Sequence, residues 1–329
     1  MNYRRKLLVS LGVSALMAPL GAFAQQAKIR RLGLLNFSTR QMLLDTGRYA
    51  AWTQGMRDLG YVEGKNFVLE ERSADGNAER LDALAAELVR LKVDLILSNG
   101  TPAHLAAQRA TRTIPIVVLA DNDPVGTGLA ASLARPGGNI TGMSSGGTEV
   151  VQKLFELLIT ALPKLSRIAV LGNPANKSHP PQLSLLQAAA KQRGKQVLPV
   201  SASAGDDVVR GFATMARDKA DAVVVLLDGF MVQNRKQISE LALKHRLPSI
   251  FPLQGYAEVG GLMSYGSDIA DNYRRAAIFV DKILKGTKPG EIPFEQPTRY
   301  YLEINRKTAN ALGVKISRDF LTRADKVIE

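Results

Sequence analysis

Acidic and hydroxyl side chains follow several apolar runs of this chain, at places where they could hold a small charged molecule. Asp228 follows the run 222–227 (AVVVLL), and Asp268 follows the run 261–265. Either aspartate could bind an ammonium group, because a buried charge needs an opposite partner. An Asx-turn or a helix cap is the alternative use. Thr101 opens a predicted helix whose free N–H groups suit a carboxylate, and plain N-capping is the alternative there.

Aromatic and basic side chains also follow the apolar runs of the chain. Four aromatic residues could stack on an apolar or aromatic part of a ligand, and packing beside a hinge is the alternative: Phe37, Phe230, Tyr256 and Tyr265. Arg40, in the loop after the first apolar run, would favour a more acidic ligand. These run ends predict ligand binding.

Motifs for catalysis and for cofactors are missing from the sequence. It contains no G-x-G-x-x-G after a strand, no G-x-x-x-x-G-K-[ST] and no G-x-S-x-G. The chain has no cysteine, and its three histidines (His104, His179 and His245) have no histidine partner at i+4. We therefore expect no metal site and no enzymatic activity.

Alternating strands and helices must position these polar side chains. Buried strands are predicted at 31–36, 93–98, 114–120, 167–172 and 222–227. Helices are predicted between them, for example at 78–91, 149–162, 233–245 and 272–284. Such alternation predicts an α/β fold of parallel sheets with helices on both faces. Since one sheet of so many strands would be unusual, we expect two doubly wound, Rossmann-like lobes with a first crossing near 142–147.

The first 24 residues are predicted to be a cleaved signal peptide. Basic residues at 4–6 precede an apolar run at 7–20, and Ala22-Phe23-Ala24 supplies small residues at both positions that a signal peptidase reads. The apolar run is shorter than the roughly 20 residues that a membrane-spanning helix needs. An uncleaved N-terminal anchor is the alternative. We expect a mature protein in the periplasm, without a lipid anchor because no cysteine is present.

The basic character of the chain is spread out rather than concentrated. The formal net charge of the whole chain is +13. Three of these positive charges belong to the leader, so the rest of the chain carries +10. After the leader no basic run exceeds two residues. Nucleic-acid binding normally needs a basic stripe or patch, so we expect no nucleic-acid partner.

Several short motifs in a fixed order carry a family resemblance. They are 59–66 (LGYVEGKN), 94–96 (DLI), 100–103 (GTPA), 114–117 (IPIV), 123–129 (DPVGTGL), 135–142 (RPGGNITG), 173–174 (NP) and 283–286 (ILKG) with Pro293. With these motifs the chain resembles the ABC-transporter substrate-binding proteins of the tryptophan/tyrosine-binding type. That family has the type I periplasmic-binding-protein fold, in which a multi-crossing hinge joins two lobes.

The resemblance implies an N-terminal lobe of residues 28–142 plus 267–297 and a C-terminal lobe of residues 143–266 plus 298–329. It implies that a small ligand is trapped between the lobes, and the first expectation is an amino acid, with aromatic amino acids among the candidates. The residues expected to bind it are Phe37, Ser38, Asn99, Gly100, Thr101, Asp121, Asp123, Asn173, Asn176, Asp228, Phe230, Tyr256 and Asp268.

The resemblance also implies partners. We expect a monomer without cofactor that delivers its ligand to an ABC permease and its ATPase in the inner membrane. A ligand-sensing subunit of a signalling receptor is the alternative, because it would use the same fold.

Overall fold

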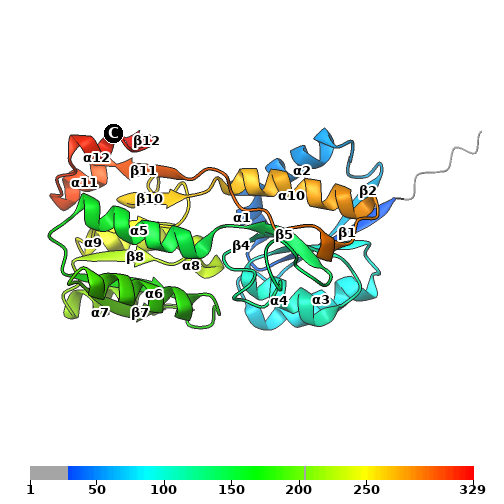
Figure 1. Cartoon of the computed structure of the whole chain (residues 1–329), viewed down its shortest axis with the longest axis horizontal. Helices are drawn as coiled ribbons and strands as arrows, with labels where there is room; N and C mark the ends of the chain where they lie inside the picture. Colours follow the sequence, from blue (N-terminus) through cyan, green and yellow to red (C-terminus); the bar gives the residue numbers. More distant parts are fainter. Residues whose placement is uncertain (1–28, 204) are drawn as a thin grey trace, which may run out of the picture.

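The computed structural model describes residues 29–203 and 205–329. The signal peptide predicted at 1–24 lies outside these residues. Within them, no helix combines the length and the apolar character that crossing a membrane requires. The described chain forms two α/β lobes that lie side by side along the long axis of the molecule (Figure 1).

The first lobe contains a sheet of five parallel strands in the order β2-β1-β3-β4-β5. Its strands are β1 (Arg30–Asn36), β2 (Phe67–Ser73), β3 (Leu95–Asn99), β4 (Ile116–Asp121) and β5 (Ile140–Ser144). The central strands are buried along nearly their whole length, for example β3 at every residue. Continuous burial is typical of parallel strands with helices on both faces, as the apolar runs predicted.

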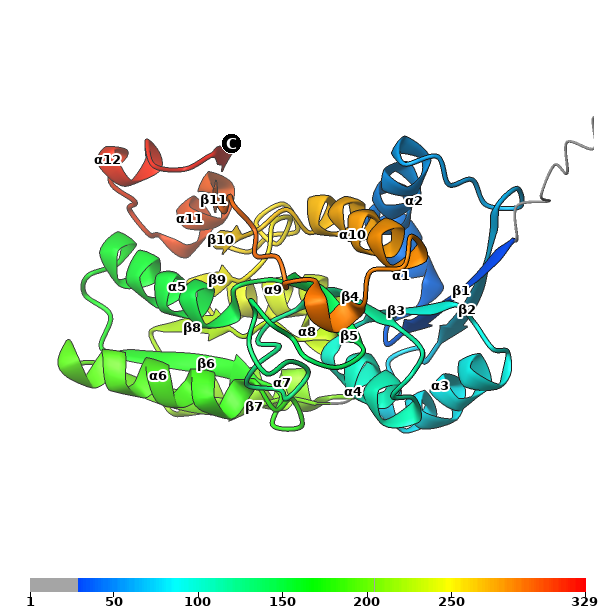
Figure 2. The same cartoon turned by 45° about the vertical axis from the view of Figure 1, so that its right-hand side comes forward.

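Helices cover both faces of this first sheet (Figure 2). One face packs against α1 (Arg40–Asp45), α2 (Arg48–Asp58) and α10 (Ile269–Leu284). The other packs against α3 (Leu81–Arg90), which the short helix η1 (Ala78–Arg80) precedes, and against α4 (Thr101–Ala110). The helix α10 follows the second lobe in the sequence but packs along α2. A Cβ at Gly55 of α2 would clash with the backbone carbonyl of Arg274, so the close packing of these two helices requires glycine there.

The second lobe contains a sheet of seven strands in the order β12-β11-β10-β9-β8-β6-β7. Its strands are β6 (Arg167–Gly172), β7 (Gln196–Ser201), β8 (Ala222–Val225), β9 (Ser249–Phe251), β10 (Met263–Gly266), β11 (Tyr301–Asn305) and β12 (Lys326–Ile328). Two strands depart from the predicted parallel arrangement, because β11 runs antiparallel to β10 and β12 runs parallel to β11. The chain leaves this lobe at the end of β10 and re-enters it at the start of β11, so β10 and β11 must point in opposite directions.

Helices cover the second sheet in the same way. The first face carries α5 (Gly147–Ala161), α6 (His179–Gln192), α11 (Arg306–Leu312) and α12 (Arg318–Leu321), and the second carries α7 (Asp207–Arg217), α8 (Gly229–Gln233) and α9 (Arg235–Lys244). The sequence predicted one helix over 233–245. The structure has α8 and α9 separated at Asn234, and α8 begins earlier because Asp228 caps it by accepting a hydrogen bond from the N–H of Phe230.

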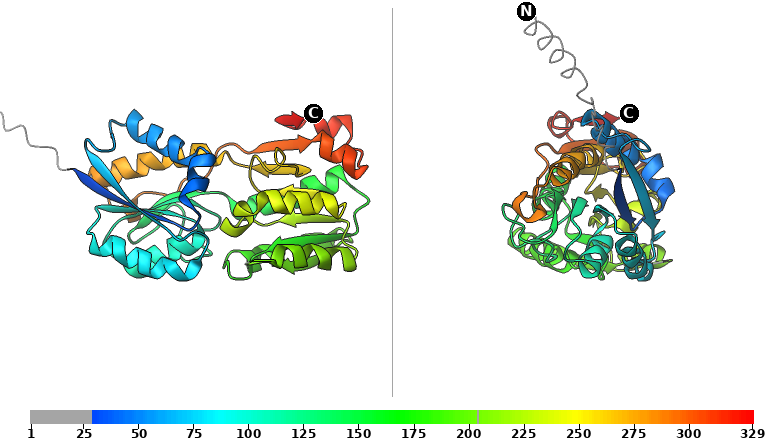
Figure 3. Two further views of the ribbon diagram at one scale, coloured as in Figure 1. Left: turned by 180° about the vertical axis from the view of Figure 1, so that it is seen from behind. Right: turned by 90° about the vertical axis from the view of Figure 1, so that its right-hand side faces the viewer.

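Three connections between the lobes occur within the described residues, at 144–147, at 266–269 and at 295–301 (Figures 1 and 3). The first and third lie side by side. The N–H of Ser144 donates to the carbonyl of Glu295 at 2.8 Å, and the N–H of Glu295 donates to the carbonyl of Gly142 at 3.0 Å. The short helix η2 (Pro289–Glu291) precedes the third connection. The lobes are therefore joined by a hydrogen-bonded hinge.

Candidate ligand-binding site

The strand order places the polar strand ends where a ligand crevice is expected. The five parallel strands of the first lobe run in the order β2-β1-β3-β4-β5, and the parallel strands of the second lobe run in the matching order β7-β6-β8-β9-β10. In such sheets ligands bind beyond the carboxyl ends of the strands at the point where the order reverses. That point lies between β1 and β3 in the first lobe and between β6 and β8 in the second. The two points face each other across the lobe boundary.

In the first lobe, a chain of buried hydrogen bonds fixes the ends of β1 and β3. The Asn99 Nδ2 donates to Asn36 Oδ1 at 2.8 Å, and Asn36 Nδ2 donates to the carbonyl of Ser38 at 2.8 Å. The Tyr273 hydroxyl of α10 donates to Asn99 Oδ1 at 2.5 Å. Burial raises the pKa of Tyr273 to about 12, so this hydroxyl remains a donor at neutral pH. The network therefore holds Ser38 and Asn99 in place.

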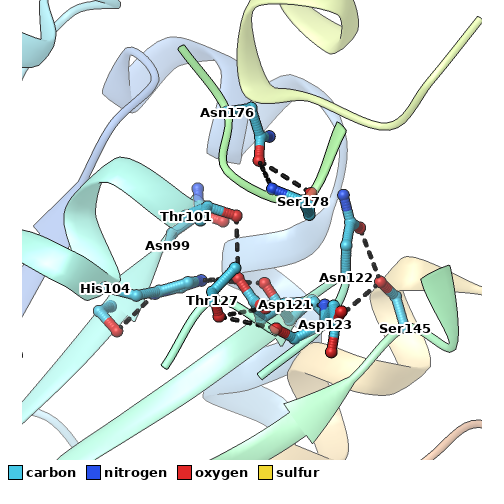
Figure 4. Close-up of polar contacts among 12 residues, drawn as sticks. Asn99, Thr101, His104, Asp121, Asn122, Asp123, Thr127, Ser145, Asn176 and Ser178 are labelled. Carbon is cyan, nitrogen blue, oxygen red and sulfur yellow. Dashed lines mark hydrogen bonds and ion pairs between the residues drawn. The ribbon is translucent and has the colours of Figure 1, made fainter. Parts of the chain in front are cut away.

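Gly100 and Thr101 form the turn from β3 into α4. Gly100 has φ 90°, and a Cβ there would lie 3.0 Å from the Phe37 Cβ, so the turn requires glycine. Gly100, not Thr101, is the N-cap residue of α4. The Thr101 hydroxyl instead donates to Asp121 Oδ2 at 2.8 Å, which ties the start of α4 to the end of β4 (Figure 4).

A buried histidine supports this turn from below (Figure 4). The Ser98 Oγ lies 2.7 Å from His104 Nδ1, and His104 Nε2 lies 3.0 Å from the Ala120 carbonyl and 3.8 Å from Asp121 Oδ2. Burial lowers the pKa of His104, so the ring is neutral, accepts from Ser98 and donates to Ala120. Ser98, His104 and Asp121 are the same three residue types that form the catalytic triad of many hydrolases. Their side chains are buried, so a substrate has no access and the cluster positions Thr101.

In the second lobe, Asp228 gathers the loops that follow β6 and β8. Its Oδ1 accepts from the N–H of Phe230 at 2.8 Å and from Asn173 Nδ2 at 3.3 Å, and its Oδ2 accepts from Asn176 Nδ2 at 2.9 Å. The Asp228 side chain is buried. These three donors stabilise a carboxylate at the edge of the lobe without neutralising its charge.

His179 connects the same two loops through the backbone. The N–H of Asn173 donates to His179 Nδ1 at 2.8 Å, and His179 Nε2 donates to the carbonyl of Leu227 at 2.9 Å. Burial lowers the pKa of His179, which agrees with a neutral ring that accepts at one nitrogen and donates at the other.

The two lobes touch each other directly at this site. Asn122 Nδ2, after β4, donates to the carbonyl of Leu227 at 2.7 Å. The Asn122 Oδ1 in turn accepts from Ser145 Oγ of the hinge at 3.0 Å (Figure 4). The ring of Phe37 lies against Gly229, where a Cβ would approach the Phe37 Cδ1 to 2.7 Å. The lobe boundary is therefore closed around the facing strand ends.

A cavity lies between these strand ends, with about 570 Å³ of space that is free of protein atoms and includes open solvent. It is lined by Ser38, Arg48, Asn99, Gly100, Thr101, Ala120, Asn122, Ser145, Asn176, Leu227, Asp228, Gly229, Val232, Leu253, Ile269 and Tyr273. An adjoining groove shares Thr101, Asn176 and Asp228 with the cavity. It is also lined by Phe37, Arg109 and Lys177, and its roughly 1,330 Å³ of atom-free space includes open solvent.

Nine of the thirteen residues predicted from the sequence lie in or directly behind this site. The structure places Ser38, Asn99, Gly100, Thr101, Asn176 and Asp228 on the cavity and Phe37 and Asn173 on the groove, while Asp121 lies behind Thr101.

Four predicted residues lie elsewhere. Asp123 does not line the cavity and accepts from the N–H of Gly126 in its own loop. Phe230 is half-buried against the core of the second lobe. Tyr256 is fully buried in that core, stacked on Phe251 with ring centroids 4.5 Å apart. Asp268 caps α10 by accepting from the N–H of Ala270, as the alternative reading anticipated.

Sequence reasoning missed the parts of the site that helices and the hinge contribute. Arg48 begins α2, Tyr273 belongs to α10, and Ser145 lies in the first crossing. Arg40, which the sequence linked to an acidic ligand, pairs instead with Glu71 at 2.9 Å outside the cavity. No group of three histidine, aspartate or glutamate side chains within the described part of the chain is arranged to hold a metal ion.

Comparison with known proteins agrees with this architecture. The family profile described as ABC transporter substrate binding protein matches residues 46–328. The chain belongs to this family. Its members are solute-binding proteins, not enzymes. A relative, the tyrosine-binding protein of Clostridioides difficile (strain R20291), is 30% identical over 267 residues, which cover 81% of this substrate-binding protein and 76% of the relative.

Solved structures share the fold of this substrate-binding protein. A conserved domain protein from Vibrio cholerae is 29% identical and superposes with a TM-score of 0.84, covering 91% of this chain and 100% of that chain. A Streptococcus pneumonia ABC domain in complex with L-Trp is 25% identical, with a TM-score of 0.84 over 92% of this chain and 100% of that one. The ligand-free, open structure of a substrate-binding protein with adhesive properties from Clostridium difficile is 24% identical, with a TM-score of 0.66 over 91% and 99% of the two chains.

Proposed function

We propose that this protein is the periplasmic solute-binding component of an ABC importer and that its ligand is an amino acid, with aromatic amino acids as the first candidates. The observation that carries the proposal is the cavity, which the polar strand ends of both lobes enclose. A ligand in this cavity contacts both lobes at once. It therefore stabilises the arrangement in which the lobes touch.

The aromatic amino acid is supported by the relatives. One relative is named for tyrosine binding, and one solved structure of similar fold holds L-Trp. The cavity offers matching chemistry: the Asp228 carboxylate suits an ammonium group, while Val232, Leu253 and Ile269 provide apolar contacts for a side chain. The predicted role of Asp228 remains part of this proposal, and Thr101, which lines the same cavity, is proposed as a further contact of the ligand.

Ligand capture proceeds by closure of the hinge. Such a protein samples open and closed arrangements, and the ligand shifts the population by binding the closed one better. The contacts of Asn122 with Leu227 and of Phe37 with Gly229 form only when the lobes approach. The higher TM-score with the L-Trp complex than with the ligand-free, open structure supports reading the present arrangement as the closed one.

The remaining features of the proposal follow from the family and the sequence. The lobes are residues 28–142 plus 267–297 and residues 143–266 plus 298–329. The chain is exported by a signal peptide at 1–24, acts as an untethered monomer and passes its ligand to a membrane permease with its ATPase. No cofactor takes part.

The test begins with mass spectrometry of any small molecule that co-purifies with the protein, followed by a thermal-shift screen of amino acids. A specific ligand raises the melting temperature in a concentration-dependent way. Calorimetry then compares the wild type with Thr101→Ala and Asp228→Asn, which should bind the ligand more weakly while keeping their fold by circular dichroism. Unchanged affinity in both variants would refute the site.

A further inference from the structure

Arg48 places a buried positive charge on the wall of the cavity. It is the first residue of α2, directly after Gly47, whose φ of 67° turns the chain into the helix. Arg48 is only 8% exposed, and it lines the cavity together with Asn99, Thr101 and Asp228. An arginine is rarely buried to this extent without a partner, because removing its charge from water is costly.

This charge has no carboxylate partner among residues 29–203 and 205–329. No Asp or Glu oxygen there lies within 4.0 Å of the Arg48 guanidinium, and the buried Arg48 Nε has no hydrogen-bond partner. The neighbouring arginine Arg40 shows the usual arrangement, since it is exposed and pairs with Glu71. The Arg48 guanidinium carbon lies 5.9 Å from the centroid of the Tyr273 ring, so a cation–π contact orients it but supplies no anion.

The start of α4, which the sequence suggested for a carboxylate, is a poorer anion site than Arg48. Pro102 at the second helical position has no N–H. The N–H groups of Ala103 and His104 both donate to the carbonyl of Gly100, at 2.8 and 3.0 Å. The helix start therefore has few free donors to offer, whereas a guanidinium presents five donors in a fork that matches a carboxylate.

We propose that Arg48 binds the carboxylate of the ligand and makes this protein selective for solutes that carry one. The inference rests on the proposed function and deepens it. Arg48 belongs to the first lobe and Asp228 to the second, so a solute with a carboxylate and an ammonium group connects the lobes by one charged end on each side. Arg48 thus sets the orientation of the ligand and excludes neutral or purely cationic analogues.

The test is calorimetry of the full-length mature protein with four probes. L-Tyrosine and L-tryptophan carry the carboxylate, and tyramine and tryptamine lack it. We expect Arg48→Gln to weaken binding of the amino acids on the order of 10- to 100-fold, the loss typical of a hydrogen bond to a charged group, and Arg48→Lys to restore part of it. The affinity for tyramine or tryptamine should be weak in the wild type and unchanged by Arg48→Gln.

The matched control is Arg40→Gln, which removes the same charge from the neighbouring helix outside the cavity and should leave all four affinities unchanged. Thermal unfolding checks that each variant folds. Equal losses for amino acids and amines, or no loss for either, would overturn the role of Arg48. If the wild type binds none of the probes, the aromatic amino acid is rejected. The solute identified by mass spectrometry then replaces the probes, and a solute without an acidic group overturns the Arg48 inference alone.

Discussion

The contact between Phe37 and Gly229 allows lobe closure to be weakened without touching the interior of either lobe. A methyl group at position 229 would lie 2.7 Å from Cδ1 and 3.0 Å from Cε1 of the Phe37 ring. The ring has little room to retreat, because Phe37 is buried and its Cβ packs against Gly100. Gly229→Ala should therefore disfavour the closed arrangement, while in an open arrangement the two residues are apart.

The size of the effect follows from the cost of overpacking. Inserting a methyl group into a well-packed contact costs typically 1–3 kcal/mol. Since this cost falls on the closed form only, the affinity for the ligand should drop by about 5- to 150-fold. The melting temperature without ligand should stay close to that of the wild type. Calorimetry measures the affinity, and small-angle X-ray scattering with saturating ligand measures how compact the molecule becomes.

Two controls make the outcome decisive. Gly211→Ala adds a methyl group 3.0 Å from Val200 Cγ1 inside one lobe, so it should lower the melting temperature with little change in affinity. In the Phe37→Leu background, Gly229→Ala should reduce the affinity for the ligand less than it does in the wild type, because leucine leaves more room for the added methyl group. The reasoning is refuted if Gly229→Ala binds the ligand like the wild type, or if its loss is the same in the Phe37→Leu background.

Three further predictions concern the hydrogen bonds of the site. Asn122→Ala removes the bond to the Leu227 carbonyl and should weaken ligand binding by about 2- to 10-fold, measured by calorimetry. Burial lowers the pKa values of His104 and His179 in the folded protein. Below about pH 6.5 these two rings therefore bind protons more readily in the unfolded chain than in the folded one. The free energy of unfolding should therefore decrease as the pH falls below about 6.5, by at most about 1.4 kcal/mol per pH unit for each ring, and urea titrations that are flat from pH 5 to 7 would contradict this. Tyr273→Phe removes a donor from the buried Asn99 amide and should lower the free energy of unfolding by about 1 kcal/mol in urea titrations.

The sequence shows clearly where the strands end, but it does not show the order in which the strands lie in the sheet. Thr101 and Asp228 follow β3 and β8, which are apolar runs with clear ends, so their positions at carboxyl ends are readable from the residues. Which ends meet depends on strand order, which no local pattern specifies. Tyr256 and Asp268 also follow strands, but β9 and β10 lie away from the point where the order reverses.

Helix residues of the site were hidden for a different reason. Tyr273 fits the apolar face of an amphipathic helix, and Arg48 resembles any basic residue near a helix start. They share one cavity because α10 returns from the second lobe and packs along α2, a contact between segments more than 200 positions apart in the chain. Only the folded topology brings them together, and Arg48 then stands out because no acidic side chain among the described residues neutralises it.

The position of the hinge gives the molecule mechanical leverage. Ser145 of the first crossing lines the cavity itself, so in the proposed hinge closure a bound solute would lie beside the axis about which the lobes rotate. Arg109 and Lys177 line the outer groove on opposite lobes, much farther along the lever arms. A small change in fit beside the axis therefore becomes a large change in the gap between the outer rims. A partner protein that contacts both outer rims can therefore distinguish the filled form from the empty form without contacting the solute.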